Sequence, residues 1–229
     1  MEVERRYEML YGGELQEQIR ERPLAWVPLG ILEKHGEHLP WGLDTLKAHG
    51  VCLFLAKQLG GVVLPGLHVT GVHEAWDEDP KKNLRLQAEV GDFYIRECTL
   101  EILLWDIVCG LSNIGFKMIV FYSGYYPPLQ EQVLRKIADE AEKEYDVDVI
   151  PFTELSLFGV GDHAGKWETS IYRAVGGEVR FEAIREDLEG QVGHWSGTNP
   201  KDASREFGQQ ALEAILQHFQ GLVGRASVG

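Results

Sequence analysis

The short stretch from Glu33 to Asp44 gathers the residue types most able to do chemistry, at the end of an apolar run. Glu33 and His35 are two positions apart, and in extended backbone such residues point to the same side. Asp44 follows a turn with Pro40 and Gly42 and can return to the same point. One imidazole and two carboxylates suit zinc, manganese or iron. The spacing predicts a metal site; the plainer alternative is a helix cap at Asp44 beside solvated loop residues.

A second polar stretch, 159–170, reads GVGDHAGKWETS and contains Asp162, His163 and Glu168. Its glycines miss the spacing of the dinucleotide fingerprint, so a phosphate-binding loop is not expected. The unperturbed pKa of histidine is near neutrality, which makes His163 a candidate general acid or base. A capping or structural role for His163 is equally compatible with the sequence alone.

A third polar stretch, SGYYPP, begins at Ser123 after another apolar run. Ser123 does not stand in the G-x-S-x-G pattern that exposes a catalytic serine, so a serine nucleophile is not expected. The sequence HEAWD, which begins at His73, lacks the second histidine of an H-E-x-x-H zinc motif. Neither feature is predicted to carry catalysis.

The composition restricts the partners and the compartment. The chain of 229 residues has 36 acidic and 22 basic residues, and its net charge of −14 disfavours nucleic acid and anionic membrane surfaces as partners. No apolar run is long enough to span a bilayer. The N-terminus shows no signal or transit pattern. We therefore expect a cytoplasmic protein with buried free thiols rather than disulfides at its three cysteines, Cys52, Cys98 and Cys109.

The elements that must position these polar stretches alternate along the chain. Apolar runs predict strands at 24–32, 62–69, 117–124, 146–152 and 178–181. Helical periodicity predicts helices at 44–59, 90–115, 128–145, 166–175 and 202–219. This alternation is typical of an α/β fold with a mainly parallel sheet covered by helices, here in a single domain over 1–229. Ligands of such sheets bind beyond the carboxyl ends of the strands, so the polar stretches are expected to meet there.

Three stretches together resemble the creatininase family. They are PLGILEKHGEHLPWGLDTLKAH from Pro28, GDHAGKWETS from Gly161, and GHWSGTNPKDASREFGQQAL from Gly193. They follow the order of the family signatures and extend over nearly the whole chain. The resemblance implies a three-layer αβα fold, a metal-centred site at the strand ends, and homo-oligomers that are often hexamers. It also implies hydrolysis of non-peptide C–N bonds in small amides or cyclic amides.

The same resemblance assigns roles to individual residues. Glu33, His35 and Asp44 match metal ligands for one or two divalent ions (Zn²⁺, Mn²⁺ or Fe²⁺), and Asp44 matches the ligand that can bridge both. His163 matches the histidine assigned to proton transfer. Glu168 matches the signature glutamate, which we count with the catalytic residues while leaving open whether it ligates the metal or supports a ligand.

The chain departs from the family in the third polar stretch. Relatives usually carry N-G-H there, with the histidine as a metal ligand and, in creatininase, a further ligating glutamate. Tyr125 and Pro127 stand at those two positions, whereas Tyr126 matches the tyrosine of creatininase. We expect Tyr125, Tyr126 and Trp167 to contact the substrate. His73, Glu74 or Glu168 could replace the lost ligand.

Another departure concerns the substrate. The segment EAWDEDPKKN at 74–83 stands where relatives usually have a Pro-Gly-Thr context. We therefore expect the substrate to be a small-molecule amide other than creatinine.

Two functional hypotheses of different classes follow. In the first, the chain is a metal-dependent amidohydrolase whose ion activates water while His163 protonates the leaving nitrogen. In the second, motivated by Tyr125 and Pro127, it is a catalytically inactive relative that acts as a binding or assembly protein. A third alternative, an unrelated α/β domain with accidental matches, is disfavoured because three matching stretches lie in the right order; a mostly antiparallel sheet would refute the resemblance.

Overall fold

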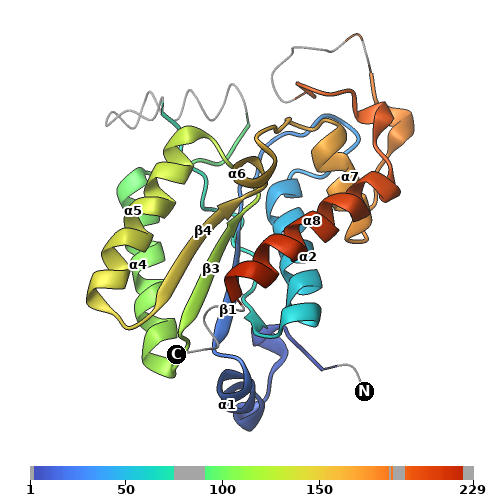
Figure 1. Ribbon diagram of the computed structural model, residues 1–229. Helices are drawn as coiled ribbons and strands as arrows, with labels where there is room; N and C mark the ends of the chain where they lie inside the picture. Colours follow the sequence, from blue (N-terminus) through green and yellow to red (C-terminus); the bar gives the residue numbers. More distant parts are fainter. Residues whose placement is uncertain (1–2, 75–90, 186, 188–193, 224–229) are drawn as a thin grey trace.

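The computed structural model describes residues 3–74, 91–185, 187 and 194–223 (Figure 1). Within this part of the chain, four strands form one parallel sheet in the order β2-β1-β3-β4. The strands are β1 (Leu24–Leu29), β2 (Val62–Val63), β3 (Met118–Ser123) and β4 (Asp148–Thr153). Leu29 pairs with Ser123, which pairs with Thr153, so three strands end side by side.

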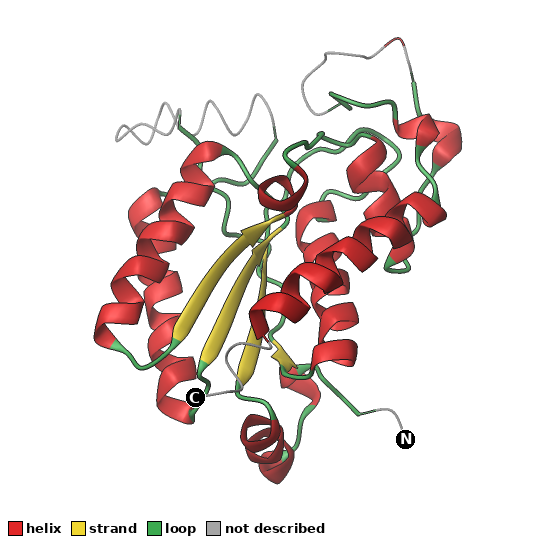
Figure 2. Cartoon of the chain, in the orientation of Figure 1, coloured by secondary structure: helices red, strands yellow, loops and turns green. Residues whose placement is uncertain are grey.

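Helices cover both faces of this sheet. Helices α4 and α5 lie on one face, and α2, α7 and α8 lie on the other (Figures 1 and 2). The helices are α1 (Gly12–Glu21), α2 (Leu43–Leu59), α4 (Glu97–Ile114), α5 (Pro128–Glu144), α6 (Glu154–Phe158), α7 (Lys166–Ala174) and α8 (Arg205–Val223), with short 3-10 turns η1 (Tyr7–Met9), η2 (Phe181–Ala183) and η4 (Pro200–Asp202). The predicted three-layer α/β arrangement with a parallel sheet is confirmed.

Side chains of β1 alternate between two apolar cores. Ala25 and Val27 join the core under α4 and α5, whereas Trp26 joins the core under α2 and α8, where its ring meets Phe219 edge-on. Every residue of β1 is buried. A strand buried on both faces reads as a continuous apolar run, which is why the sequence predicted it.

Several predicted boundaries were wrong. The helix predicted at 90–115 begins at Glu97, because Phe93 and Ile95 bond through their backbone N–H groups to Leu32 and Gly71. The strand predicted at 178–181 is not formed: the Arg180 N–H donates to the His38 carbonyl, and a 3-10 turn follows. Strand β1 ends three residues before predicted Leu32, at Leu29, and β2 is limited to Val62–Val63. The last helix begins at Arg205, after the separate turn η4.

Two further expectations concern the surface. Among the described residues, no helix combines the length and the apolar composition that crossing a membrane requires. The three cysteines are free, as predicted, but the expectation that they are all buried was wrong. Cys52 is buried, whereas Cys98 is exposed on α4. The unusual segment 74–83 lies, from residue 75 onward, outside the described residues.

Two glycines bring the start of α2 against the strand ends. A Cβ atom on Gly124 would lie 2.1 Å from the Asp44 carbonyl oxygen, and one on Gly30 would lie 2.5 Å from the Thr45 nitrogen. No side chain fits at such distances, so only glycine allows β1 and β3 to approach α2 this closely. This close packing places the first turn of α2, with Asp44, at the carboxyl edge of the sheet.

Candidate metal centre

Three buried carboxylates surround one histidine at the carboxyl ends of β1 and β3. His35 Nε2 lies 3.2 Å from Asp44 Oδ1, 3.5 Å from Glu33 Oε1 and 3.7 Å from Glu168 Oε2. All four side chains are buried. Glu33 and His35 come from the loop after β1, Asp44 from the first turn of α2, and Glu168 from the first turn of α7. Residues more than 120 positions apart in sequence therefore converge on one point.

The orientation of the His35 ring fits a metal ligand. Its Nδ1 lies 3.1 Å from the Glu33 backbone carbonyl, which can only accept, so Nδ1 carries the proton of the neutral ring. Nε2 then turns a lone pair toward the carboxylates. Neither His35 Nε2 nor Asp44 Oδ2 makes a hydrogen bond. Buried polar atoms are almost always paired, and electron-rich atoms facing one another need a cation between them. The donor set thus fits a divalent ion.

The carboxylates favour positive charge at His35, whether from a proton or from a metal ion. Burial alone would lower the pKa of His35, but Asp44, with Glu168 and Glu33 behind it, raises it to about 10. A proton on Nε2 is the other way to bring positive charge among these carboxylates. A metal ion would have to displace that proton, as is usual for imidazole ligands.

His163 lies directly beside this cluster. Its ring stacks on the His35 ring with centroids 4.5 Å apart, and its Nδ1 lies 3.5 Å from Glu33 Oε1. The ring Nε2 lies 2.9 Å from the Lys34 carbonyl and donates to it. Burial raises the pKa of Glu33 to about 7. Burial lowers the pKa of His163, but its contact with Glu33 outweighs this and raises it. Glu33 and His163 are therefore placed to share a proton.

Two groups of candidate ligands share His35. In each group, one ligand atom per residue lies within 4.8 Å of the others; the groups are Glu33, His35 and His163, and His35, Asp44 and Glu168. The second group is fully buried, whereas the His163 side chain is 31% exposed. The five residues predicted for metal binding and proton transfer are thus all brought together.

The GDHAG sequence holds Glu168 in place. The Asp162 carboxylate accepts hydrogen bonds from the backbone N–H groups of Trp167 and Glu168 at 2.8 and 3.2 Å, which caps the start of α7. The Ala164 N–H donates to Glu168 Oε2 at 2.8 Å, and Ala164 adopts a positive φ of 52° to do so. A Cβ on Gly165 would lie 2.3 Å from Asp162 Oδ2. The signature is a capping turn that aims one glutamate into the cluster.

The third polar stretch behaves differently. Tyr125 is buried, and its hydroxyl donates to the Val72 carbonyl at 3.3 Å. Burial, together with the negative charge of Glu33, raises the pKa of Tyr125 far above its usual value. The phenol therefore keeps its proton. Ser123 is also buried, and its hydroxyl donates to the Tyr125 carbonyl. Tyr126 reaches the cluster, with its hydroxyl 3.3 Å from Glu168 Oε1.

A cavity of about 190 Å³ opens onto the cluster. It is lined by Glu33, Asp44, Gly124, Tyr125, Tyr126, Pro127, Asp162, His163 and Glu168. Both tyrosines predicted to contact the substrate therefore face this space. The ring of Trp167 packs against Phe158 and Phe207 instead, at centroid distances of 4.9 and 4.7 Å.

Comparison with known proteins identifies the family. A family model described as creatininase (creatinine amidohydrolase) matches residues 8–223, nearly the whole chain. The chain belongs to the creatininase family. A curated relative, the creatinine amidohydrolase of Pseudomonas putida, is 24% identical in an alignment that covers 83% of this chain and 85% of that protein.

Solved structures of creatininases share the fold of this family member. A crystal structure of creatinine amidohydrolase (creatininase) has a TM-score of 0.77 at 21% identity, covering 98% of each chain. A structure described as "Creatininase Mn" has a TM-score of 0.77 at 19% identity, covering 99% of this chain and 100% of the other. A creatininase mutant of Zn-Zn type has a TM-score of 0.77 at 20% identity, covering 99% of this chain and 100% of the other.

A buried ion-pair network adjoins the creatininase-family cluster and was missed in the sequence. Lys47, three residues after Asp44 on α2, is 0% exposed, and its Nζ lies 2.7 Å from Glu154 Oε2 and 3.0 Å from Glu168 Oε1. Burial alone would lower the pKa of Lys47, but the two carboxylates raise it far above its usual value. The spacing of Asp44 and Lys47 puts both on one helix face, which was the available signal.

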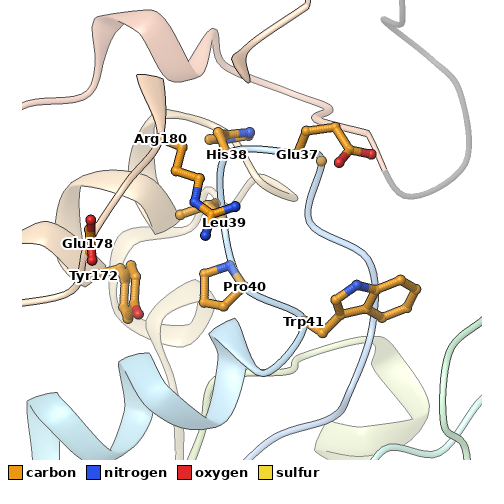
Figure 3. A pocket seen from close by; sticks show the side chains of 9 residues that line it. Glu37, His38, Leu39, Pro40, Trp41, Tyr172, Glu178 and Arg180 are labelled. Atoms are coloured by element: carbon orange, nitrogen blue, oxygen red, sulfur yellow. The ribbon is translucent and has the colours of Figure 1, made fainter. Parts of the chain in front are cut away.

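A second cavity borders the loop after β1. It measures about 350 Å³ and is lined by Gly36, Glu37, His38, Leu39, Pro40, Trp41, Tyr172, Glu178 and Arg180. Figure 3 shows Arg180 and Tyr172 on one side of Pro40 and Trp41 on the other. His38 is buried, bonds through Nε2 to the Ala164 carbonyl at 3.0 Å, and has a pKa lowered to about 4 by burial. This histidine joins the two signature loops of the family.

Proposed function

We propose that this protein is a metal-dependent amidohydrolase that cleaves a non-peptide C–N bond of a small amide or cyclic amide. The observation that carries the proposal is the buried His35 Nε2, which faces three carboxylates and makes no hydrogen bond. The family membership supports it, because the Pseudomonas putida relative is a creatinine amidohydrolase. Related solved structures are described as manganese and zinc-zinc forms.

The proposed ligands are His35, Asp44 and Glu168, with Glu33 beside them. Three protein ligands and an open position are typical of catalytic zinc sites. A divalent ion bound there would polarise a carbonyl group and lower the pKa of water. The expectation of one or two ions narrows to one, because the Tyr125 hydroxyl donates to the Val72 carbonyl instead of offering a ligand to a second ion.

The proposed proton carrier is His163. Its Nδ1 faces Glu33 Oε1 at 3.5 Å, and both residues line the cavity over the cluster. The bond from His163 Nε2 to the Lys34 carbonyl fixes the ring, so that Nδ1 is the atom that gains and loses the proton. His163 would deliver this proton to the departing nitrogen, and Glu33 would keep the imidazole oriented.

The proposed substrate is small and contacts an aromatic wall. A cavity of about 190 Å³ walled by Tyr125, Tyr126 and Pro127 leaves room for a compact amide. The contacts proposed for Trp167 would have to be indirect, since its ring packs against Phe158 and Phe207. The family resemblance also supports a homo-oligomer, which light scattering of the purified chain would test.

The competing hypothesis of an inactive binding or assembly protein rests on Tyr125 and Pro127. Two changed positions in one loop are a real departure from the creatininase pattern. The cluster around His35 supports a bound ion under either hypothesis, because a buried imidazole nitrogen without a hydrogen bond needs a partner. Turnover by the metal-loaded chain is what separates the two hypotheses.

Hydrolysis of a panel of small amides and cyclic amides tests the proposal. The chain is loaded with zinc or manganese, and release of amine or carboxylate is followed. Turnover that disappears in His35→Ala and falls steeply in His163→Asn would support it. A loaded wild-type chain that cleaves none of the panel, or a His35→Ala variant as active as wild type, would contradict it.

A further inference from the structure

The ammonium group of Lys47 is enclosed beside the candidate metal centre. Lys47 is 0% exposed, Glu154 4% and Glu168 3%. Lys47 Nζ lies between the two carboxylates, 2.7 Å from Glu154 Oε2 and 3.0 Å from Glu168 Oε1. Burying charged groups is costly unless each is paired, so these three must be held together in the folded protein.

The two oxygens of Glu168 have different partners. Oε1 lies 3.0 Å from Lys47 Nζ and 3.3 Å from the Tyr126 hydroxyl. Oε2 accepts from the Ala164 N–H at 2.8 Å and lies 3.7 Å from His35 Nε2. One oxygen is therefore directed away from the histidine by a cation, and the other is directed toward it.

We propose that Lys47 is a positioning residue of the metal centre: it holds Glu168 Oε1 so that only Oε2 can bind the ion. This inference rests on the proposed function, because it assumes an ion at His35, Asp44 and Glu168. Carboxylates bind metals through one or both oxygens. A glutamate limited to one oxygen leaves a coordination position open for water or substrate, as catalytic sites require.

Glu154 holds Lys47 from the opposite side. Its Oε2 pairs with Lys47, and its Oε1 accepts from the Tyr122 hydroxyl at 3.0 Å. Glu154 begins α6, directly after β4, so it is fixed to the sheet. The ammonium group is thus anchored to the end of one strand while it orients a glutamate on α7.

A purely structural role for Lys47 is the rival explanation. In that case, Lys47 only neutralises Glu154, and the site is indifferent to it. The single variant Lys47→Met does not separate the two explanations, because it leaves Glu154 buried without its cation. The double variant Lys47→Met with Glu154→Gln does, because it removes both charges and leaves Tyr122 a side chain to bond with.

Zinc affinity of the full chain, measured by competition with a chromophoric chelator, is the test. We expect zinc to bind the double variant at least about tenfold more weakly than wild type, as typical for residues that orient ligands. In Glu154→Gln alone, the amide oxygen can still accept from Lys47, and Lys47 stays paired with Glu168. This variant should therefore bind zinc within about twofold of wild type. Lys143→Met, an exposed lysine on α5, is the control. Circular dichroism verifies folding.

The outcomes are distinguishable. Wild-type affinity in the double variant, or an equal loss in Glu154→Gln alone, overturns the role of Lys47 and leaves the proposed function standing. A wild-type chain that binds no zinc, or a His35→Ala variant that binds it as wild type does, overturns the proposed function itself.

A crystal structure of the zinc-loaded wild-type chain gives a second test that needs no variant. We expect Glu168 Oε2 at about 2.0–2.2 Å from zinc, the usual carboxylate distance, with Oε1 remaining on Lys47. Both Glu168 oxygens bound to zinc would overturn the proposal.

Discussion

The loops after β1 and β3 end at the same edge of the sheet and border the same cavity, yet they present opposite chemistry. The loop after β1 directs His35 Nε2 at three carboxylates and leaves it without a hydrogen bond. The loop after β3 directs the Tyr125 hydroxyl at the Val72 carbonyl and satisfies it there. A buried nitrogen without a partner is costly unless something binds it, whereas a satisfied hydroxyl has nothing to gain from a ligand. The loop after β1 therefore binds the ion, whereas the loop after β3 only lines the cavity.

The largest effect should come from removing the shared imidazole. His35→Ala takes away the nitrogen at which all three carboxylates converge, so zinc affinity should fall more than about a hundredfold, beyond the range for residues that only orient ligands. Metal content per chain after dialysis measures it. His218→Ala, a histidine on α8 that packs against Phe152, is the control and should keep its metal. Zinc retained by His35→Ala would place the binding site elsewhere.

Removing the proposed proton carrier should separate chemistry from binding. His163→Asn deletes the group that shares a proton with Glu33, so turnover should fall about 10²- to 10⁴-fold, the usual contribution of general acid–base catalysis. Zinc content should stay at the wild-type value if His35, Asp44 and Glu168 hold the ion. A parallel loss of zinc in His163→Asn would show that the histidine is a ligand instead.

Stability should respond strongly to the buried lysine. Lys47→Met leaves Glu154 without its cation, and breaking a buried pair in this way typically costs about 3–5 kcal/mol of unfolding free energy. Urea unfolding of the metal-free chain measures it. Adding Glu154→Gln should recover much of the loss, because no unpaired charge then remains buried. A loss below about 1 kcal/mol, the usual value of an exposed pair, would mean that the network relaxes into solvent.

The smallest effect should come from a change in the loop after β3, which only lines the cavity. Tyr125→Phe removes one hydrogen bond to the Val72 carbonyl, which should cost about 0.5–1.5 kcal/mol of unfolding free energy. Zinc affinity should not change, because the phenol is not a ligand. Weaker zinc binding in Tyr125→Phe would contradict this account, because it would show that the loop after β3 takes part in binding the ion.

The sequence alone predicted the convergence of Glu33, His35 and Asp44, because their spacing after an apolar strand has few geometric outcomes. The expected sheet topology brought the stretch with His163 and Glu168 to the same edge, but only the resemblance to creatininases gave these two residues roles beside the ligands. The parallel sheet followed from apolar runs that are buried on both faces. These parts of the fold and the site depend on local patterns.

Other features depend on packing that no local pattern contains. The Lys47–Glu154 contact joins residues 107 positions apart and exists only because α2 and α6 meet at the sheet edge. The direction of Tyr125 depends on the Val72 carbonyl. The strand predicted at 178–181 had a suitable pattern, but its backbone bonds to the His38 loop rather than to another strand.

The number of ions per chain tests the contrast between the two loops most directly. Elemental analysis of protein purified without added metal or chelator, together with calorimetric titration of the metal-free chain with zinc, gives this number. One tightly bound ion per chain is the predicted result, held by the loop after β1 with α2 and α7. Two ions per chain would contradict the claim that the loop after β3 supplies no ligand. A chain that binds no zinc after reconstitution would contradict the metal centre altogether.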